Sequence, residues 1–173
     1  MFGGVEAGGT KFVCVIGTGP GDIAETQRID VADPANTIEA ALDFFRRGLA
    51  AGTQLDAIGI GSFGPVELRR SNPRYGFITT TAKPGWSRTD VAGPFAAALG
   101  IPIGFDTDVN AAALAEGRWG AARGLASFVY LTLGTGIGGG TVIDGRLLRG
   151  LGHPETGHIA VPRRPRRTRR ADA

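Results

Sequence analysis

The tripeptide Gly-Gly-Thr occurs twice in this sequence, at 8–10 and at 139–141, and each copy lies between two runs of apolar residues. Apolar runs joined by glycine-rich turns indicate paired strands, because glycine accepts the backbone angles that tight turns require. The chain therefore opens with an antiparallel strand pair and repeats that opening after residue 122. Two interpretations remain open: a duplicated domain opening, or two glycine-rich hairpins that are alike by chance.

The stretch that follows the first strand pair predicts a mixed α/β domain. A helix is expected to begin at Asp33-Pro34, because aspartate caps helices, proline suits the first helical position, and the apolar residues that follow recur at helical spacing. Short buried strands are expected within 55–67 and at 101–106. A strongly helical stretch then follows, with Asp108 as its expected N-cap. This order of elements is typical of a sheet with parallel and antiparallel strands covered by helices.

The net charge of +3 is not spread evenly along the chain. Six arginines lie in the last eleven residues, and without that segment the acidic residues outnumber the basic ones. We therefore expect a disordered Arg-rich tail at 162–173 and no specific nucleic-acid partner for the folded part. Cys14 is the single cysteine, no apolar run is long enough to span a membrane, and the first residues do not resemble a secretory signal. These features favour a cytoplasmic protein.

Two glycine-rich segments, EAGGTK and GTGIGGG, could bring backbone amides close to a phosphate, or could simply form tight turns. Gly134, Gly136 and Gly139 satisfy G-x-G-x-x-G, but a strand follows them where a dinucleotide-binding fold needs a helix. GVEAGGTK at 4–11 lacks the Gly-Lys-Ser/Thr ending of a P-loop. Both common nucleotide-binding motifs are therefore disfavoured.

Polar residues with chemical potential gather in two segments. Asp108 follows a buried strand at a helix start, where it could accept a proton from a substrate hydroxyl or only cap the helix. Asn110 could bind a sugar hydroxyl or the local backbone. His153, Glu155 and His158 lie within six residues, a spacing that suits a polyol or a metal but also occurs among ordinary surface residues.

Six motifs in a fixed order carry a family resemblance. GGVEAGGTKF, GIGSFGP, TTTAKPGW, DTDVNAAALAE, LTLGTGIGGG and GHPETGHI resemble the motifs of the ROK family of bacterial sugar kinases, and in particular its fructokinase branch, over about residues 2–161. The resemblance implies an α/β chain with the actin-like ATPase (RNase H-like) fold, in which ATP and sugar lie between two lobes. Here it implies one complete lobe at 1–122 and the start of a second at 123–161.

The resemblance also assigns site residues. It implies that Asp108 is the catalytic base, and that Glu6, where most members carry Asp, holds Mg²⁺ through water. His158 stands where the family places a ligand of a structural zinc, and Pro154 replaces a family glycine. The implied ATP phosphate-binding residues are Gly8, Gly9, Thr10, Lys11, Gly134, Thr135, Gly136, Gly138 and Gly139, and the implied sugar-binding residues are Gly64, Pro65, Asn110, Glu155 and His158.

The implied reaction is the ATP- and Mg²⁺-dependent phosphorylation of a hexose, with fructose converted to fructose 6-phosphate. Glucokinase-type or mannokinase-type specificity and a catalytically inactive sugar-binding remnant are the alternatives, and a homodimer remains open. Family members continue beyond GHPETGHI into three zinc-binding cysteines and an adenosine pocket, whereas no cysteine follows Cys14 here. We therefore expect a C-terminally truncated chain that cannot complete the zinc site, transfers little phosphate by itself, and is poorly soluble because no helix covers Phe128, Tyr130 and Leu131.

Overall fold

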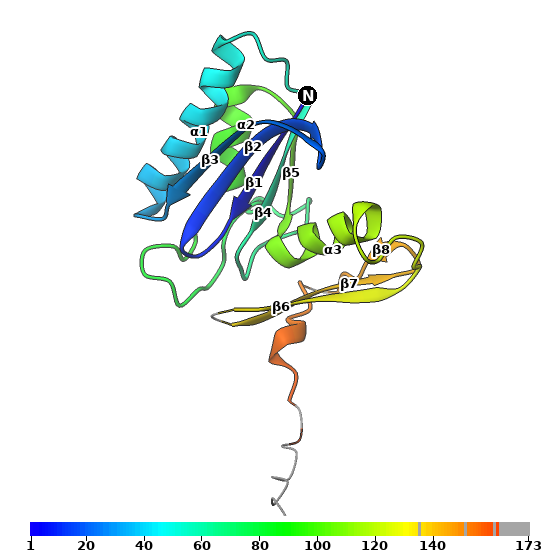
Figure 1. Cartoon of the computed structure of the whole chain (residues 1–173). Coiled ribbons are helices and arrows are strands. Elements are labelled where there is room, and N and C mark those ends of the chain that lie inside the picture. The colour runs from blue at the N-terminus through cyan, green and yellow to red at the C-terminus, as the bar shows by residue number, and fades with distance from the viewer. Residues whose placement is uncertain (135, 151, 161, 163–173) are drawn as a thin grey trace, which may run out of the picture.

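The computed structural model describes residues 1–134, 136–150, 152–160 and 162. The chain forms a five-stranded sheet in the order β3-β2-β1-β4-β5 and a three-stranded sheet in the order β6-β7-β8. Figure 1 shows the two sheets on opposite sides of one helix, α3 (Asp108–Trp119). The expected disordered tail lies, apart from Pro162, outside the described residues. The division of the chain at residues 122 and 123 stays a prediction.

The five-stranded sheet begins with an antiparallel meander of β1 (Phe2–Ala7), β2 (Lys11–Gly19) and β3 (Asp22–Asp30). This confirms the antiparallel opening expected from the first apolar runs. The strands β4 (Ala57–Ser62) and β5 (Ile103–Thr107) then join parallel to β1. The carboxyl ends of β1, β4 and β5 consequently lie at the same edge of the sheet.

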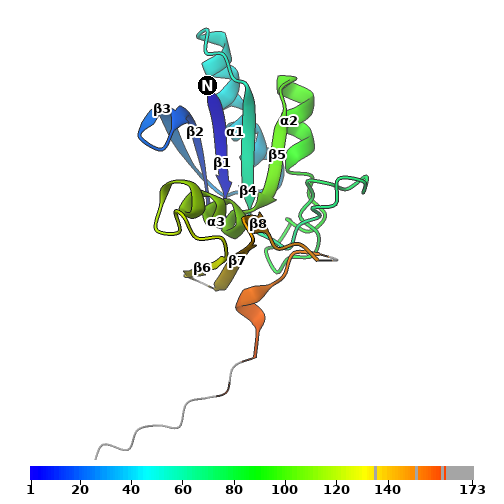
Figure 2. The same ribbon diagram turned by 90° about the vertical axis from the view of Figure 1, so that its right-hand side faces the viewer.

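Helices α1 (Pro34–Ala50) and α2 (Ala92–Leu99) cover one face of this sheet (Figure 1 and Figure 2). Asp33 caps α1 as expected, because its Oδ1 accepts a hydrogen bond of 3.0 Å from the backbone N–H of Asn36. The core between sheet and helices contains large buried side chains, among them Phe12, Phe45 and Phe95. Phe45 packs edge-on against Phe95, which joins the two helices.

A buried tryptophan, Trp86, anchors the irregular segment between β4 and α2. Trp86 is fully buried, packs against Phe12 and Phe63, and donates a hydrogen bond of 3.2 Å from Nε1 to the carbonyl of Ala32. Earlier in the same segment, a bridge between Val66 and Ile78 closes the loop between these two residues. The TTTAKPGW motif is thus fixed at its tryptophan against β2 and the segment before α1.

Helix α3 begins one residue earlier than its expected cap suggests. The N-cap is Thr107, whose Oγ1 accepts a hydrogen bond of 3.1 Å from the backbone N–H of Asn110, so the expectation that Asp108 is the cap is wrong. The reason is that β5 extends to Thr107, which leaves Asp108 as the first residue of the helix. The carboxylate of Asp108 is therefore not used as the helix cap.

The second sheet consists of β6 (Phe128–Leu133), β7 (Ile137–Ile143) and β8 (Arg146–Leu147), and a 3₁₀ helix, η1 (Thr156–His158), follows it. The first two strands form the expected hairpin. The second Gly-Gly-Thr tripeptide lies inside β7, however, and not at the turn as the first one does. The two hairpins are alike in their strand pairing but not in the position of this tripeptide.

Helix α3 covers one face of the β6–β7 hairpin. Phe128 and Tyr130 point to that side and are half-buried, which corrects the expectation that no helix would cover them. Leu131 is exposed as expected, together with Val129 and Leu133 on the same outer face of β6.

None of the helices in the described part of the chain combines the length and apolarity that crossing a bilayer requires.

Candidate active site

The site is built around a row of three residues at the carboxyl edge of the first sheet. Strand pairing aligns Glu6 in β1 with Gly61 in β4, and Gly61 with Asp106 in β5. Side chains at aligned positions of neighbouring strands point to the same face, so both carboxylates lie on the side of α3. Gly61 in the middle leaves the space into which α3 begins: a Cβ there would lie 2.9 Å from the Cβ of Ala111 and 3.3 Å from the Cα of Asp108.

The carboxylate of Asp108 is a stronger base than an ordinary aspartate. Its burial raises its pKa, and the nearby charge of Glu6 raises it further. The backbone N–H of Val109, which donates to Oδ1 at 2.8 Å, and the side chain of His153 act in the opposite direction. A half-buried carboxylate with a raised pKa beside a cleft is the usual setting of a general base.

The amide of Asn110 is oriented by the neighbouring carboxylate. Asn110 is fully buried, and its Nδ2 donates a hydrogen bond of 2.6 Å to Oδ1 of Asp106. Because a carboxylate only accepts, this contact fixes which end of the amide carries the oxygen. Oδ1 of Asn110 is left buried with no hydrogen-bond partner among the described residues. Asn110 therefore lies in the first turn of α3 as a buried acceptor.

A cleft of about 1000 Å³ lies beside Asp108. It brings together residues from the first turn, from the segment after β4, from the start of α3, from the hairpin tip and from the GHPETGH segment. The predicted site residues that line it are Gly9, Thr10, Gly64, Pro65, Asp108, Gly134, Gly136, Gly138, Glu155 and His158. Residues far apart in the sequence thus meet around one space.

Some predicted residues lie elsewhere. The N–H of Gly8 donates to the carbonyl of Lys11 at 3.0 Å, so both residues help to close the β1–β2 turn. A Cβ on Gly139 would lie 2.9 Å from the Cβ of Thr156, so close packing against η1 explains why a glycine stands at this position. Among the described residues these three and Asn110 do not line the cleft, and their ligand contacts stay predictions. The prediction for Thr135 lies outside the described residues.

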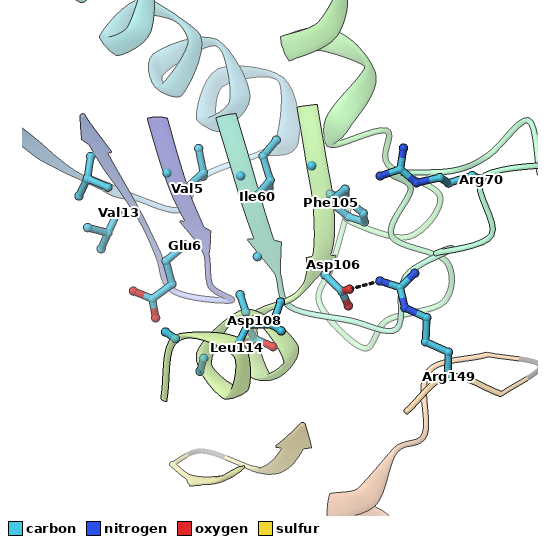
Figure 3. Close-up of a pocket in the computed structure, with 18 residues that line it drawn as sticks. Val5, Glu6, Val13, Ile60, Arg70, Phe105, Asp106, Asp108, Leu114 and Arg149 are labelled. Atoms are coloured by element: carbon cyan, nitrogen blue, oxygen red, sulfur yellow. Dashed lines mark hydrogen bonds and ion pairs between the residues drawn. The ribbon is translucent and has the colours of Figure 1, made fainter. Parts of the chain in front are cut away.

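Glu6 lines a different hollow, shown in Figure 3. This groove of about 690 Å³ runs along the open face of the five-stranded sheet, over the glycines of the central strands and between Val13 and Leu114. Asp108 lines both the groove and the cleft. At the other end of the groove, Nη2 of Arg149 donates to Oδ2 of Asp106 at 2.5 Å.

The sequence reasoning missed several residues of the cleft. Phe63, Thr80, Thr81 and Lys83 all line it, as does His153, which the sequence pattern had pointed to together with Glu155 and His158. The motif TTTAKPGW carries the resemblance, but its side chains were assigned no role. Lys83 belongs to a chain that has only two lysines, at 11 and 83, and this scarcity is a signal that could have marked it.

The residues expected at the zinc site do not form a donor set. His158 Nδ1 lies 3.4 Å from Oε2 of Glu155, and the described residues contain no group of three His, Cys, Asp or Glu side chains that could hold a metal ion. Cys14 is fully buried in the core, where burial raises the pKa of its thiol to about 12. The described residues therefore offer no place for zinc in the reaction.

Comparisons with known proteins identify relatives of this chain. The sequence model of the ROK family matches residues 2–169. A relative from Bacillus subtilis is 48% identical over 165 residues, which cover 95% of this chain and 54% of the relative. The fructokinase of Zymomonas mobilis is 43% identical over 166 residues, 95% of this chain and 55% of that protein. The chain spans about half the length of the curated relatives it matches.

The fold has a counterpart among solved structures. A ROK family glucokinase from Streptomyces griseus, in complex with glucose and AMPPNP, matches with a TM-score of 0.74 and 31% identity. The match covers 93% of this chain and 51% of that chain. The expected α/β class and actin-like ATPase fold are thereby confirmed.

Proposed function

Because this chain belongs to the ROK family, we propose that it serves the ATP-dependent phosphorylation of a hexose, with fructose converted to fructose 6-phosphate. The observation that carries the proposal is the position of Asp108. Its carboxylate lies where the first domain, the hairpin and the GHPETGH segment meet, and its pKa is raised. A sugar hydroxyl in this cleft would find a base that is stronger than an ordinary aspartate.

The proposed reaction transfers one phosphoryl group. The hexose hydroxyl gives its proton to Asp108 as its oxygen bonds to the γ-phosphorus, and the bond from that phosphorus to the leaving oxygen of ADP breaks. Glu155 and His158 line the same cleft and would bind other hydroxyls of the sugar. Asn110 is buried, and the hydrogen bond from its Nδ2 to Asp106 would hold the start of α3 against the end of β5.

The nucleotide would lie along the glycine turns. Gly9, Gly134 and Gly136 line the cleft, and at each of them a Cβ would meet no atom within 4 Å. Their backbone is open to a ligand, as phosphate binding by amides requires. Bound Mg²⁺ would supply positive charge for the phosphates, and Glu6, whose charge acts on Asp108, offers the kind of oxygen donor that this ion prefers.

Fructose is the first choice of substrate because fructokinases are among the relatives with 40% identity or more. A glucokinase-type substrate is the alternative, since the matched Streptomyces griseus structure holds glucose. Cytoplasmic location, a homodimer and low turnover by these 173 residues alone remain part of the proposal. The rate at which these 173 residues form hexose phosphate distinguishes a working kinase from a sugar-binding remnant.

Two measurements test the proposal on the 173-residue protein. The first is titration calorimetry with fructose, mannose and glucose, which detects hexose binding whether or not turnover occurs. The second is formation of hexose phosphate from ATP and Mg²⁺. Asp108→Asn should lower the rate by about 100-fold or more, the usual contribution of a general base. The matched control is Asp144→Asn, an exposed aspartate in the turn between β7 and β8. Absence of hexose binding would refute the proposed function, and so would an unchanged rate in Asp108→Asn where the unchanged protein forms measurable hexose phosphate.

A further inference from the structure

The segment that connects β8 to η1 is tied to the hairpin at both of its ends. Before it, the backbone N–H of Leu148 donates to the carbonyl of Thr141 in β7 at 2.8 Å. After it, Thr156 packs on β7, where a Cβ added to Gly139 would lie 2.9 Å from the Cβ of Thr156. Glu155, which lines the cleft, lies just before this second attachment. By these contacts alone, the segment would follow the hairpin.

Arg149 ties the same segment to the five-stranded sheet. Its Nη2 donates to Oδ2 of Asp106, at the end of β5, at 2.5 Å (Figure 3). No other hydrogen bond or ion pair of the described residues between 149 and 160 reaches that sheet. The side chain of Asp106 is 13% exposed, so water screens this pair less than it screens a pair at the surface.

The carboxylate of Asp106 is itself fixed relative to the proposed base. Its Oδ1 accepts from the backbone N–H of Thr107 at 2.8 Å and from Nδ2 of Asn110 at 2.6 Å. Thr107 caps α3, and Asp108 is the first residue of that helix. The strand end and the helix start that hold Asp108 therefore also fix the partner of Arg149.

The pair acts on the cleft from outside it. Among the described residues, Arg149 and Asp106 line the groove on the open face of the sheet and do not line the cleft. Asp108 and Glu155, in contrast, both line the cleft, and they belong to the two segments that the pair connects. Any effect of the pair on a sugar in the cleft is consequently indirect, through the placement of Glu155 relative to Asp108.

Resting on the proposed function, we propose that the ion pair between Arg149 and Asp106 is a positioning contact that holds the cleft ready for the acceptor hexose. It connects the segment that carries Glu155 to the strand end beside Asp108 before a sugar arrives. The sugar then does not have to order that segment when it binds, a cost that would otherwise reduce its affinity. The pair thereby strengthens hexose binding without touching the hexose.

Titration calorimetry of the 173-residue protein measures this effect with whichever of fructose, mannose and glucose binds most tightly. Arg149→Met removes the positive charge and keeps an apolar stem. Asp106→Asn removes the negative charge and keeps an oxygen that can accept from Asn110. We expect each variant to bind the hexose about fivefold more weakly, the upper end of what a partly exposed ion pair contributes. Arg149→Lys keeps the charge and should bind it within about twofold of the unchanged protein.

A double-mutant cycle shows whether the two side chains act through each other. Asp106→Asn combined with Arg149→Met should bind the hexose as weakly as either single variant, because the pair is already broken after the first substitution. The matched control is Arg146→Met. It removes the same charge from an exposed arginine in β8 that has no ion-pair partner among the described residues, and it should leave hexose affinity unchanged. Thermal unfolding of each variant verifies that it is folded.

The outcomes separate the inference from the proposed function. If the unchanged protein and a folded Arg149→Met bind the hexose equally well, the inference is wrong while the proposed function stands. Additive losses in the double variant also overturn it, because the two side chains then act separately. An equal loss in Arg146→Met does so too, since net charge then explains the effect. If no hexose binds the unchanged protein, the proposed function fails and the inference fails with it.

Discussion

Arg149 donates from Nη2 to Oδ2 of Asp106 at 2.5 Å, and the other oxygen of that carboxylate accepts from Nδ2 of Asn110 at 2.6 Å. One side chain at the end of β5 thus joins the segment after β8 to the first turn of α3. The guanidinium of Arg149 is about half exposed, whereas Asn110 is fully buried. The two hydrogen bonds of Asp106 therefore differ in what their loss would cost.

Removing Asp106 should destabilise the protein more than removing its exposed partner. Asp106→Ala leaves the amide of Asn110 buried without an acceptor, which costs about 1–3 kcal/mol. Arg149→Ala removes a half-exposed guanidinium and leaves Asp106 with its hydrogen bond from Asn110, so it should cost less than Asp106→Ala does. Urea unfolding followed by circular dichroism measures both values. Equal losses would show that Asn110 finds another partner when Asp106 is absent.

Stability should fall with rising pH because of Asp108. Burial raises the pKa of its folded-state carboxyl, so the folded chain holds this proton more tightly than the unfolded chain does. The contribution to the free energy of unfolding is therefore lost as pH rises from about 4, the ordinary aspartate value, through the folded pKa. Asp108→Asn should melt at a higher temperature than the unchanged protein near neutral pH, and at the same temperature in acid.

A control of opposite sign is available in the same chain. Hydrogen bonds from the backbone and side chain of Asn36 lower the pKa of Asp33, so its contribution is present above the ordinary aspartate value and is lost as pH falls. Asp33→Ala should therefore lower the melting temperature at neutral pH. A stabilised Asp33→Ala or a destabilised Asp108→Asn at neutral pH would contradict these assignments.

Gly140 should not tolerate a side chain. A Cβ there would collide with the carbonyl oxygen of Val109 and lie 2.9 Å from the Cβ of Ala113, because β7 crosses α3 at this point. Gly140→Ala should cost about 1–3 kcal/mol, the usual range for overpacking. Gly59→Ala is the matched control, since a Cβ on this strand glycine meets no atom within 4 Å. Chemical denaturation measures the free energy of unfolding of both variants. Similar values would mean that the hairpin moves aside without cost.

Cys14 should be inert to thiol reagents in the folded protein. Burial raises the pKa of its thiol to about 12, and the side chain is inaccessible to solvent. A colorimetric disulfide reagent at mildly alkaline pH should label no thiol in buffer and one per chain in concentrated urea. The labelling rate would then report the opening of the first sheet. Rapid labelling under native conditions would show that this core opens readily.

The outer face of β6 should limit solubility without contributing to stability. Val129 and Leu133 are exposed, whereas Tyr130 on the other face is half-buried against α3. Val129→Thr combined with Leu133→Thr should raise the concentration at which the protein precipitates and leave its melting temperature unchanged. Tyr130→Thr should instead lower the melting temperature. A large loss of stability in the first variant would mean that this face is covered in solution.

The elements that the sequence predicts well are those with local signals. Asp33-Pro34 marks the start of α1 because cap and first helical residue are adjacent. The cap of α3 was mistaken because Thr107 and Asp108 can both cap a helix, and the choice depends on how far β5 continues to pair with β4. The covering of Phe128 and Tyr130 by α3 likewise depends on contacts between separate elements, which periodicity does not report.

The candidate site likewise combines residues that local motifs predict with contacts that no local motif predicts. Asp108 and Glu155 lie in motifs that carry a family resemblance, and the structure brings both to one cleft. The ion pair of Asp106 with Arg149 spans 43 positions and has no local signature. That Nδ1 of His153 is buried without a hydrogen-bond partner among the described residues is likewise a property that only packed coordinates reveal.

Helix α3 rests on β4 and β5 with one side and on β6 and β7 with the other. Any rotation of the hairpin about the axis of this helix moves Asp108, which lies at the end of the axis, far less than it moves Gly134 and Gly136 at the hairpin tip. The helix is thus the pivot of such a rotation, with Asp108 near its axis and the glycine-rich tip far from it. A small turn at the hairpin base would carry the tip across the cleft while Asp108 stays nearly in place.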